Sequence, residues 1–244
     1  NSNGAKVTLA KIYRRQSKNQ EAIKLLDEVL QNGKNPLTIA SAYNSKAICF
    51  KNLGKFKEAI LSYEKALFTY KKALKVEHHK AYNSINHNFG NVYKRINQYD
   101  MAIQYFDRAI KGRVIIEGEM SSGHALSNYG MSQVYLQIGN YKLAMVYAKK
   151  SLEIYKSLYP SNHGIVIQIN SYLSDIQRYL KDDDYKVENI IQQENNYRQF
   201  KLNHPDQKNE IFNLGLNLAF AYTQNSMFEK SDFIFRELDD LVTT

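Results

Sequence analysis

Six copies of one pattern of small and bulky residues occupy nearly the whole 244-residue chain, and this repetition constrains its fold more than any other feature. One position of the pattern is aromatic and recurs at spacings of 37, 43, 42, 44 and 43 residues. This aromatic column consists of Tyr13, Phe50, Tyr93, Tyr135, Tyr179 and Tyr222. A column of mostly small residues lies three positions earlier and consists of Ala10, Ala47, Gly90, Ser132, Ile176 and Ala219. Because residues three apart share a helix face, we expect both columns to form the packing side of one helix.

Three further columns follow each aromatic residue and predict a second helix. In the first copy they are Ala22, Leu26 and Val29, which lie four and three residues apart and so share one face. Turn residues stand between the two helices: Gly54 and Gly139 suit a left-handed conformation, and Asn97 tolerates one. The fifth copy departs from the pattern, because Glu188, Gln192 and Asn195 stand at the second-helix columns. Its turn is expected at Asp182, Asp183 and Asp184.

Each copy therefore predicts a helical hairpin whose apolar face is covered by stacking on its neighbours. The predicted fold is an all-α, right-handed α-solenoid of about six antiparallel helix pairs in a single array over residues 1–244. We expect the pairs near residues 5–31, 37–76, 79–117, 121–158, 163–202 and 207–240. We expect the aromatic column to be buried in every pair.

The segments FGNVYKRINQYDMAIQYFDRAI and KAICFKNLGKFKEAILSYEKAL closely resemble the tetratricopeptide repeat, or TPR. The period of about 42 residues exceeds the usual 34 and is similar to that of kinesin light chains and of bacterial Rap-type peptide receptors. The resemblance implies a superhelix that holds a protein or peptide in a concave groove. We expect the chain to be the sensor or recognition part of a larger signalling protein, because the repeat array ends abruptly.

The candidate binding residues lie one position beyond the packing stripe of each first helix. They are Lys11, Arg14, Arg15, Asn44, Lys51, His87, Asn88, Asn91, Lys94, Arg95, Gln133, Gln137, Gln177 and Asn217. Amide side chains carry both a donor and an acceptor, so a row of them can bind the backbone of an extended peptide. The family resemblance assigns this groove-lining role to Asn44, Asn88 and Asn217. The cationic members would select acidic side chains or a terminal carboxylate.

The net charge of +9 lies almost entirely in the first third of the chain. Residues 1–75 hold 15 Lys and Arg against 5 Asp and Glu, whereas residues 76–244 hold 18 against 19. This asymmetry favours an acidic protein or peptide partner. Nucleic-acid binding by the basic third is the alternative, and it is less favoured because no exposed aromatic set is interleaved with the basic residues.

No sequence motif of catalysis, nucleotide binding or metal binding is present, so we expect no enzyme activity, cofactor or metal site. A second alternative is a regulatory domain of an enzyme whose catalytic domain lies elsewhere. The lone Cys49 is expected to be a buried, unreactive residue, and it favours a cytoplasmic location. No apolar run is long enough to span a membrane. The abrupt ends of the repeat array suggest a segment of a longer protein, or a homo-oligomer formed through its uncapped ends.

Overall fold

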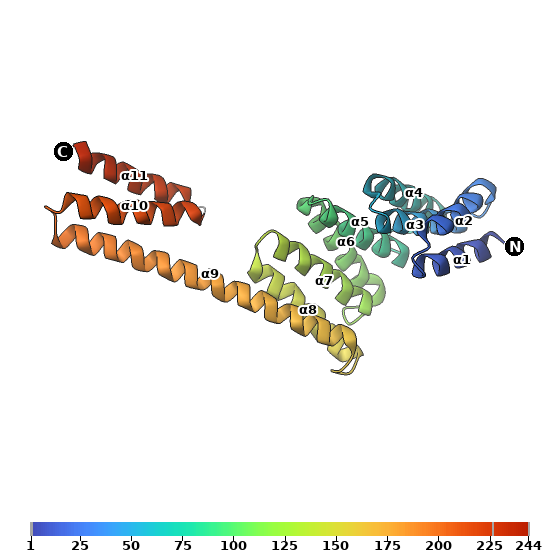
Figure 1. Ribbon diagram of the computed structural model, residues 1–244. Coiled ribbons are helices and arrows are strands. Elements are labelled where there is room, and N and C mark those ends of the chain that lie inside the picture. The colour runs from blue at the N-terminus through green and yellow to red at the C-terminus, as the bar shows by residue number, and fades with distance from the viewer. Residues whose placement is uncertain (1, 226, 244) are drawn as a thin grey trace. The chain divides into compact units, whose positions relative to one another are not determined.

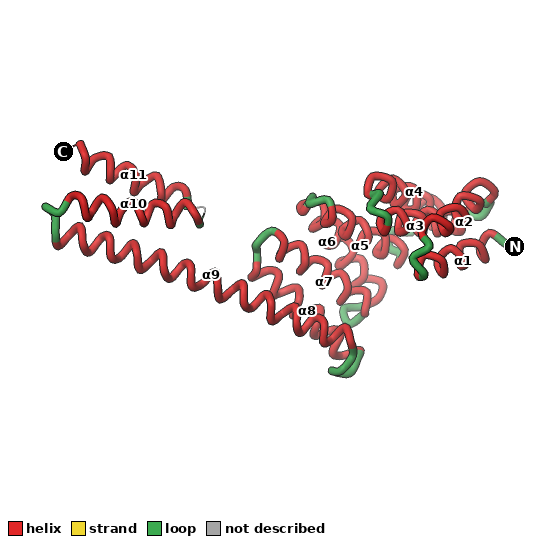
Figure 2. The backbone as a smooth tube through the Cα atoms, in the orientation of Figure 1, coloured by secondary structure: helices red, strands yellow, loops and turns green. Residues whose placement is uncertain are grey.

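The computed structural model describes residues 2–225 and 227–243, and within them it contains helices and no strand. Figures 1 and 2 show the helices, which are α1 (Asn3–Arg15), α2 (Asn19–Asn32), α3 (Pro36–Asn52), α4 (Phe56–Leu74), α5 (Lys80–Arg95), α6 (Tyr99–Glu117), α7 (Ser122–Gln137), α8 (Tyr141–Leu158), α9 (Gly164–Asn203), α10 (Lys208–Gln224) and α11 (Phe228–Thr243). The all-α prediction is confirmed. The chain divides into two compact units, unit 1 (Asn1–Gln177) and unit 2 (Arg178–Thr244).

Unit 1 begins with four helical hairpins, α1–α2, α3–α4, α5–α6 and α7–α8, stacked in chain order (Figure 1). Each hairpin turns through one residue with a positive φ, and that residue always lies four positions after the aromatic column. These residues are Ser17 (62°), Gly54 (74°), Asn97 (59°) and Gly139 (79°). The left-handed turns predicted at Gly54, Asn97 and Gly139 are confirmed. The shared position explains why the four hairpins close in the same way.

The small-residue column is buried in all six copies, as its packing role requires. The aromatic column packs against the cores of the four hairpins through Tyr13, Phe50, Tyr93 and Tyr135, but these four residues are half-buried, so the expected full burial is wrong there. Tyr93, for example, stacks on Tyr105 of the paired helix with ring centroids 5.3 Å apart. Close approach of the helices at small residues leaves room for these rings beside them.

The prediction of a hairpin over residues 163–202 is wrong, because the turn expected at residues 182–184 is helical. Helix α9 runs without a break from Gly164 to Asn203, and Asp183 is helical at the position where the four hairpins have their left-handed residue. The segment contains neither Gly nor Pro after Gly164. Its second-helix columns are also polar, and Glu188, Gln192 and Asn195 are all exposed. Folding the helix back would bury these groups without partners, so the continuous helix is the favourable alternative.

The two halves of α9 contribute to different cores. In unit 1, Val166 and Ile169 pack with Ile154 and Tyr155 of α8. In unit 2, the second half packs on the pair α10–α11, and Tyr197 lies in the same core as Leu218 and Leu238. Tyr222 of the aromatic column is buried there. Tyr179 of the same column is not buried. It is 40% exposed, because the continuous helix leaves no second helix folded over it.

Candidate functional site

The first helices of unit 1 form one continuous surface. Helix α1 contacts α3, α3 contacts α5 and α5 contacts α7, whereas successive second helices of the described hairpins make no comparable contacts. The first helices are therefore the more closely spaced row, which places them on the inner side of the stack. We call the exposed side of α1, α3, α5 and α7 the groove. The candidate residues from Lys11 to Gln137 lie on these four helices.

A cluster of cations crosses the groove from α1 to α5. It consists of Arg14, Lys51, Lys94 and Arg95, and we call it the cation cluster. Arg14, Lys51 and Lys94 are half-buried, and Arg95 is exposed. Burial lowers the pKa of Lys51, and the charges of Arg14 and Arg95 lower it further. Burial, Arg95 and Lys51 together lower the pKa of Lys94 to about 8.

No carboxylate offsets the cation cluster within the part of the chain that the structure describes. The ion pairs of this basic region involve other residues, such as Lys6 with Glu28 at 2.7 Å and Lys46 with Asp27. The Nε atom of Arg14 is buried and has no hydrogen-bond partner. Like charges held close together and partly desolvated are unfavourable in the free chain, so this arrangement is suited to an anionic partner.

A cavity of about 420 Å³ adjoins the cation cluster. It brings together four predicted residues, Lys94 and Arg95 of α5 with Gln133 and Gln137 of α7. Lys94 Nζ donates a hydrogen bond to Gln133 Oε1, which joins the two helices across the groove.

The cavity also includes Tyr172 of α9, which was not among the predicted residues. Tyr172 Oη lies 3.3 Å from Ser132 Oγ, and its ring meets that of Tyr129 edge-on with centroids 5.2 Å apart. Burial raises its pKa to about 12, so the phenol keeps its proton. Tyr172 is outside the stripe from which the groove residues were predicted, and no repeated pattern marks it.

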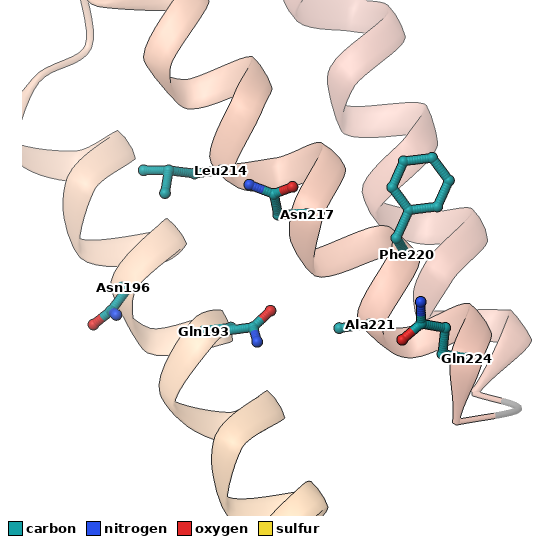
Figure 3. Close-up of a pocket in the computed structure, with 7 residues that line it drawn as sticks. All are labelled: Gln193, Asn196, Leu214, Asn217, Phe220, Ala221 and Gln224. Carbon is teal, nitrogen blue, oxygen red and sulfur yellow. The ribbon is translucent and has the colours of Figure 1, made fainter.

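Unit 2 contains a second, uncharged cavity of about 470 Å³ (Figure 3). Four amide side chains line it, Gln193 and Asn196 from α9 and Asn217 and Gln224 from α10, together with the ring of Phe220. Asn217 was predicted. Gln193 and Asn196 were not predicted, because they were expected on the outer helix of a hairpin that does not form.

The prediction that His87 faces the groove is wrong, because its side chain is only 8% exposed. His87 lies three residues before Gly90 of the small-residue column, which places it on the packing side of α5. Its ring meets Phe106 edge-on with centroids 5.3 Å apart. Its Nδ1 lies 3.2 Å from Ser127 Oγ. Burial and the charges of Arg113, Lys51 and Lys94 lower its pKa to about 3.

The remaining candidates are accessible but are not brought together in one place. Lys11 and Arg15 are exposed on α1, and Gln177 is exposed near the middle of α9 outside both cavities. Asn44, Asn88 and Asn91 are half-buried on α3 and α5. The groove of unit 1 is therefore the larger continuous assembly of predicted residues.

Models of the tetratricopeptide repeat match residues 7–73 and 81–157, which together make up more than half of the chain. The chain belongs to the tetratricopeptide repeat family. No curated protein sequence matches it.

Solved structures of TPR proteins share the fold at low sequence identity. BtubC (BKLC) from P. vanneervenii is 15% identical, with a TM-score of 0.56 over 96% of this chain and 77% of its own. A putative kinesin light chain from Podosopora anserina with nearly identical TPR-like repeats is 14% identical, with a TM-score of 0.54 over 97% and 93%. A Rap protein complexed with Competence and Sporulation Factor is 15% identical, with a TM-score of 0.61 over 98% and 74%. The resemblance to kinesin-light-chain and Rap-type arrays is confirmed at the level of fold.

Other reactive side chains of this TPR chain do not form a second kind of site. Cys49 is buried, and burial raises its pKa to about 11, so it is a protonated thiol at neutral pH. Among the described residues, no three His, Cys, Asp or Glu side chains are grouped as metal ligands would be. None of the described helices combines the length and the apolar character that crossing a membrane requires.

Proposed function

We propose that this TPR chain is a non-catalytic scaffold that binds an acidic, extended peptide segment of a partner protein in the groove of unit 1. The observation that carries the proposal is the cation cluster, in which Arg14, Lys51 and Lys94 are partly buried beside one another without a carboxylate among the described residues. We further propose that it acts in the cytoplasm as the recognition part of a larger signalling protein.

An acidic segment would relieve the repulsion within the cluster. Lys51 and Lys94 each have cationic neighbours, and a carboxylate placed between them would interact favourably with both. The wall beyond them is made of amides, Gln133 and Gln137, which can donate to and accept from a peptide backbone. Charge would thus set the preference for acidic side chains, and the amides would bind the main chain.

The amide-lined cavity of unit 2 supports a second contact for the same kind of ligand. Gln193, Asn217 and Gln224 offer donors and acceptors without charge, and Phe220 offers an apolar ring. These groups suit a neutral stretch of extended chain. Among the proteins of similar fold, a Rap protein was solved in complex with Competence and Sporulation Factor, which agrees with ligand binding by such an array.

A fluorescently labelled octaglutamate peptide tests the proposal by titration at several salt concentrations. We expect saturable binding that weakens as salt rises. The triple variant Lys51→Ala, Lys94→Ala, Arg95→Ala should lose at least tenfold in affinity, about 1.4 kcal/mol or more. The matched control replaces Lys57, Lys71 and Lys72, three exposed cations of α4, and should bind within about twofold of the unaltered chain.

Two results would contradict the proposal. One is equal affinity of the groove variant and the unaltered chain. The other is that single-stranded RNA binds more tightly than octaglutamate and with a steeper salt dependence, which would favour the nucleic-acid alternative.

A further inference from the structure

Asn91 has a side chain whose orientation is fixed by two neighbouring acceptors. Its Nδ2 lies 3.2 Å from the backbone carbonyl oxygen of His87, one helical turn earlier. A carbonyl oxygen can only accept, so the atom that faces it must be the NH₂ nitrogen of the amide. The opposite orientation would bring two oxygens together. The identity of the two amide branches therefore follows from geometry.

The same nitrogen determines the tautomer of His87. Asn91 Nδ2 also lies 2.9 Å from His87 Nε2, and it has a second hydrogen to donate. Nε2 must then be the unprotonated ring nitrogen. The ring proton is left on Nδ1, which donates to Ser127 Oγ of α7 at 3.2 Å. Ser127, His87 and Asn91 form a hydrogen-bonded chain from the interface between α5 and α7 to the groove.

Both hydrogens of the Asn91 amide are used within the protein, and its carbonyl oxygen Oδ1 is not. Among the described residues no donor reaches Oδ1, and Asn91 is only partly buried, one helical turn before Lys94 on α5. This position consequently offers an acceptor and no donor to the groove. A cationic donor is disfavoured there, because Lys51 and Lys94 are near enough to influence His87.

We infer that His87 is a positioning residue that fixes Asn91 with Oδ1 toward the groove, so that Asn91 binds a neutral backbone N–H of the peptide. The inference rests on the proposed function and adds a specificity-determining residue to it. It assigns the cation cluster to the carboxylates of the ligand and Asn91 to its main chain.

Two peptide probes separate these contributions. Octaglutamate and its analogue with every backbone nitrogen methylated carry the same carboxylates, but the analogue lacks backbone N–H groups. We expect the unaltered chain to prefer octaglutamate by about fivefold or more, the size of one net hydrogen bond. The variant His87→Phe keeps a ring beside Phe106 but has no acceptor for Asn91, and its preference should fall about threefold relative to that of the unaltered chain.

The matched control is His124→Phe, because His124 is also buried but lies outside the contact with Asn91. It should keep the full preference for octaglutamate. If weaker packing alone reduced the preference for octaglutamate, that preference would fall equally in His87→Phe and His124→Phe. A preference that stays unchanged in His87→Phe, or falls equally in His124→Phe, overturns the inference.

A measurement without any peptide tests the His87 tautomer that fixes the orientation of the Asn91 amide. The imidazole ¹⁵N resonances of the full chain should show the His87 proton on Nδ1, and Ser127→Ala should weaken that state. A proton on Nε2 overturns the inference. Failure of octaglutamate to bind the unaltered chain would instead contradict the proposed function, and the tautomer would still decide whether Asn91 is held as inferred.

Discussion

Gly90 of α5 lies directly against the ring of Phe106 in α6, and a Cβ atom at Gly90 would come within 2.8 Å of that ring. The ring is fully buried, and a Cβ at Gly130 of α7 would also come within 2.4 Å of it, so the ring lies close against the backbone of α7 as well. The two glycines hold Phe106 between successive first helices. This contact sets how closely the third and fourth repeats stack, and therefore the geometry of the groove.

Gly90→Ala should destabilise the chain by about 1–3 kcal/mol, because the added methyl group overpacks a site that cannot relax. Urea unfolding followed by circular dichroism measures this loss. Gly4→Ala is the matched control, since its Cβ would meet only Ser2 Oγ at 3.9 Å, and it should be neutral or slightly stabilising. Equal stability of the two variants would contradict the close packing described at Phe106.

Asp183→Gly distinguishes the continuous helix α9 from a hairpin. Within a helix, glycine in place of aspartate costs a few tenths of a kcal/mol or more, so thermal stability and helicity should fall slightly. At a left-handed turn position the same change would be stabilising. The matched substitution Asn97→Gly, at a true turn with φ of 59°, should raise stability. A stabilised Asp183→Gly variant would show that residues 182–184 form a turn.

His87 should make folding stability depend on pH in the acid range. Its pKa is about 3 in the folded chain and about 6.5 when unfolded, so the folded state favours the neutral ring. This contribution to stability is complete above pH 6.5 and is lost as the pH falls toward 3. At pH 4.5 the unaltered chain should have lost about 2 kcal/mol more than His87→Phe relative to pH 7. Parallel pH profiles of urea unfolding for the two proteins would contradict a buried, neutral His87.

Removing the charge of Lys94 should raise the folding stability of the chain and weaken its binding of octaglutamate. Its pKa of about 8 lies below the usual value of 10.5, so its charge destabilises the fold at pH 7, and this cost is relieved as the pH rises from about 8 to 10.5. Lys94→Met should raise Tm by about 2–4 °C at pH 7 while it weakens octaglutamate binding.

The same charge predicts how binding depends on pH. Affinity of the unaltered chain for octaglutamate should decline between pH 7 and 9 as Lys94 loses its proton, and Lys94→Arg should remove most of that decline. A pH-independent affinity in the unaltered chain would show that Lys94 does not contact the peptide.

The sequence predicted those parts of the fold where local and long-range signals agree. At Gly54, Asn97 and Gly139 a residue suited to the turn coincides with the interval between two apolar stripes, and hairpins form. In the fifth copy the interval continues through Tyr179, but Asp183 does not stop the helix and the second stripe is polar. Periodicity alone therefore predicted a turn that local propensity and burial do not support.

The groove was predicted in outline because its cations lie on a regular helical stripe. His87 was misplaced because polar side chains usually lie on the open side of a helix, although its position three residues before Gly90 places it on the packing side. Tyr172 was missed because it lies outside the predicted stripe, and Gln193 was missed because its position depends on how α9 continues past the expected turn. Pairwise hydrogen bonds such as that between His87 and Asn91 require coordinates.

Backbone amide resonances of the chain, followed during titration with octaglutamate, show which helices bind the peptide. The largest shifts should fall on the first helices, at Lys51, Asn91, Lys94 and Arg95, and the exposed lysines of α4 should change little. Shifts concentrated on the second helices α2, α4, α6 and α8, or spread evenly over all cationic residues, would contradict a peptide-binding groove in unit 1.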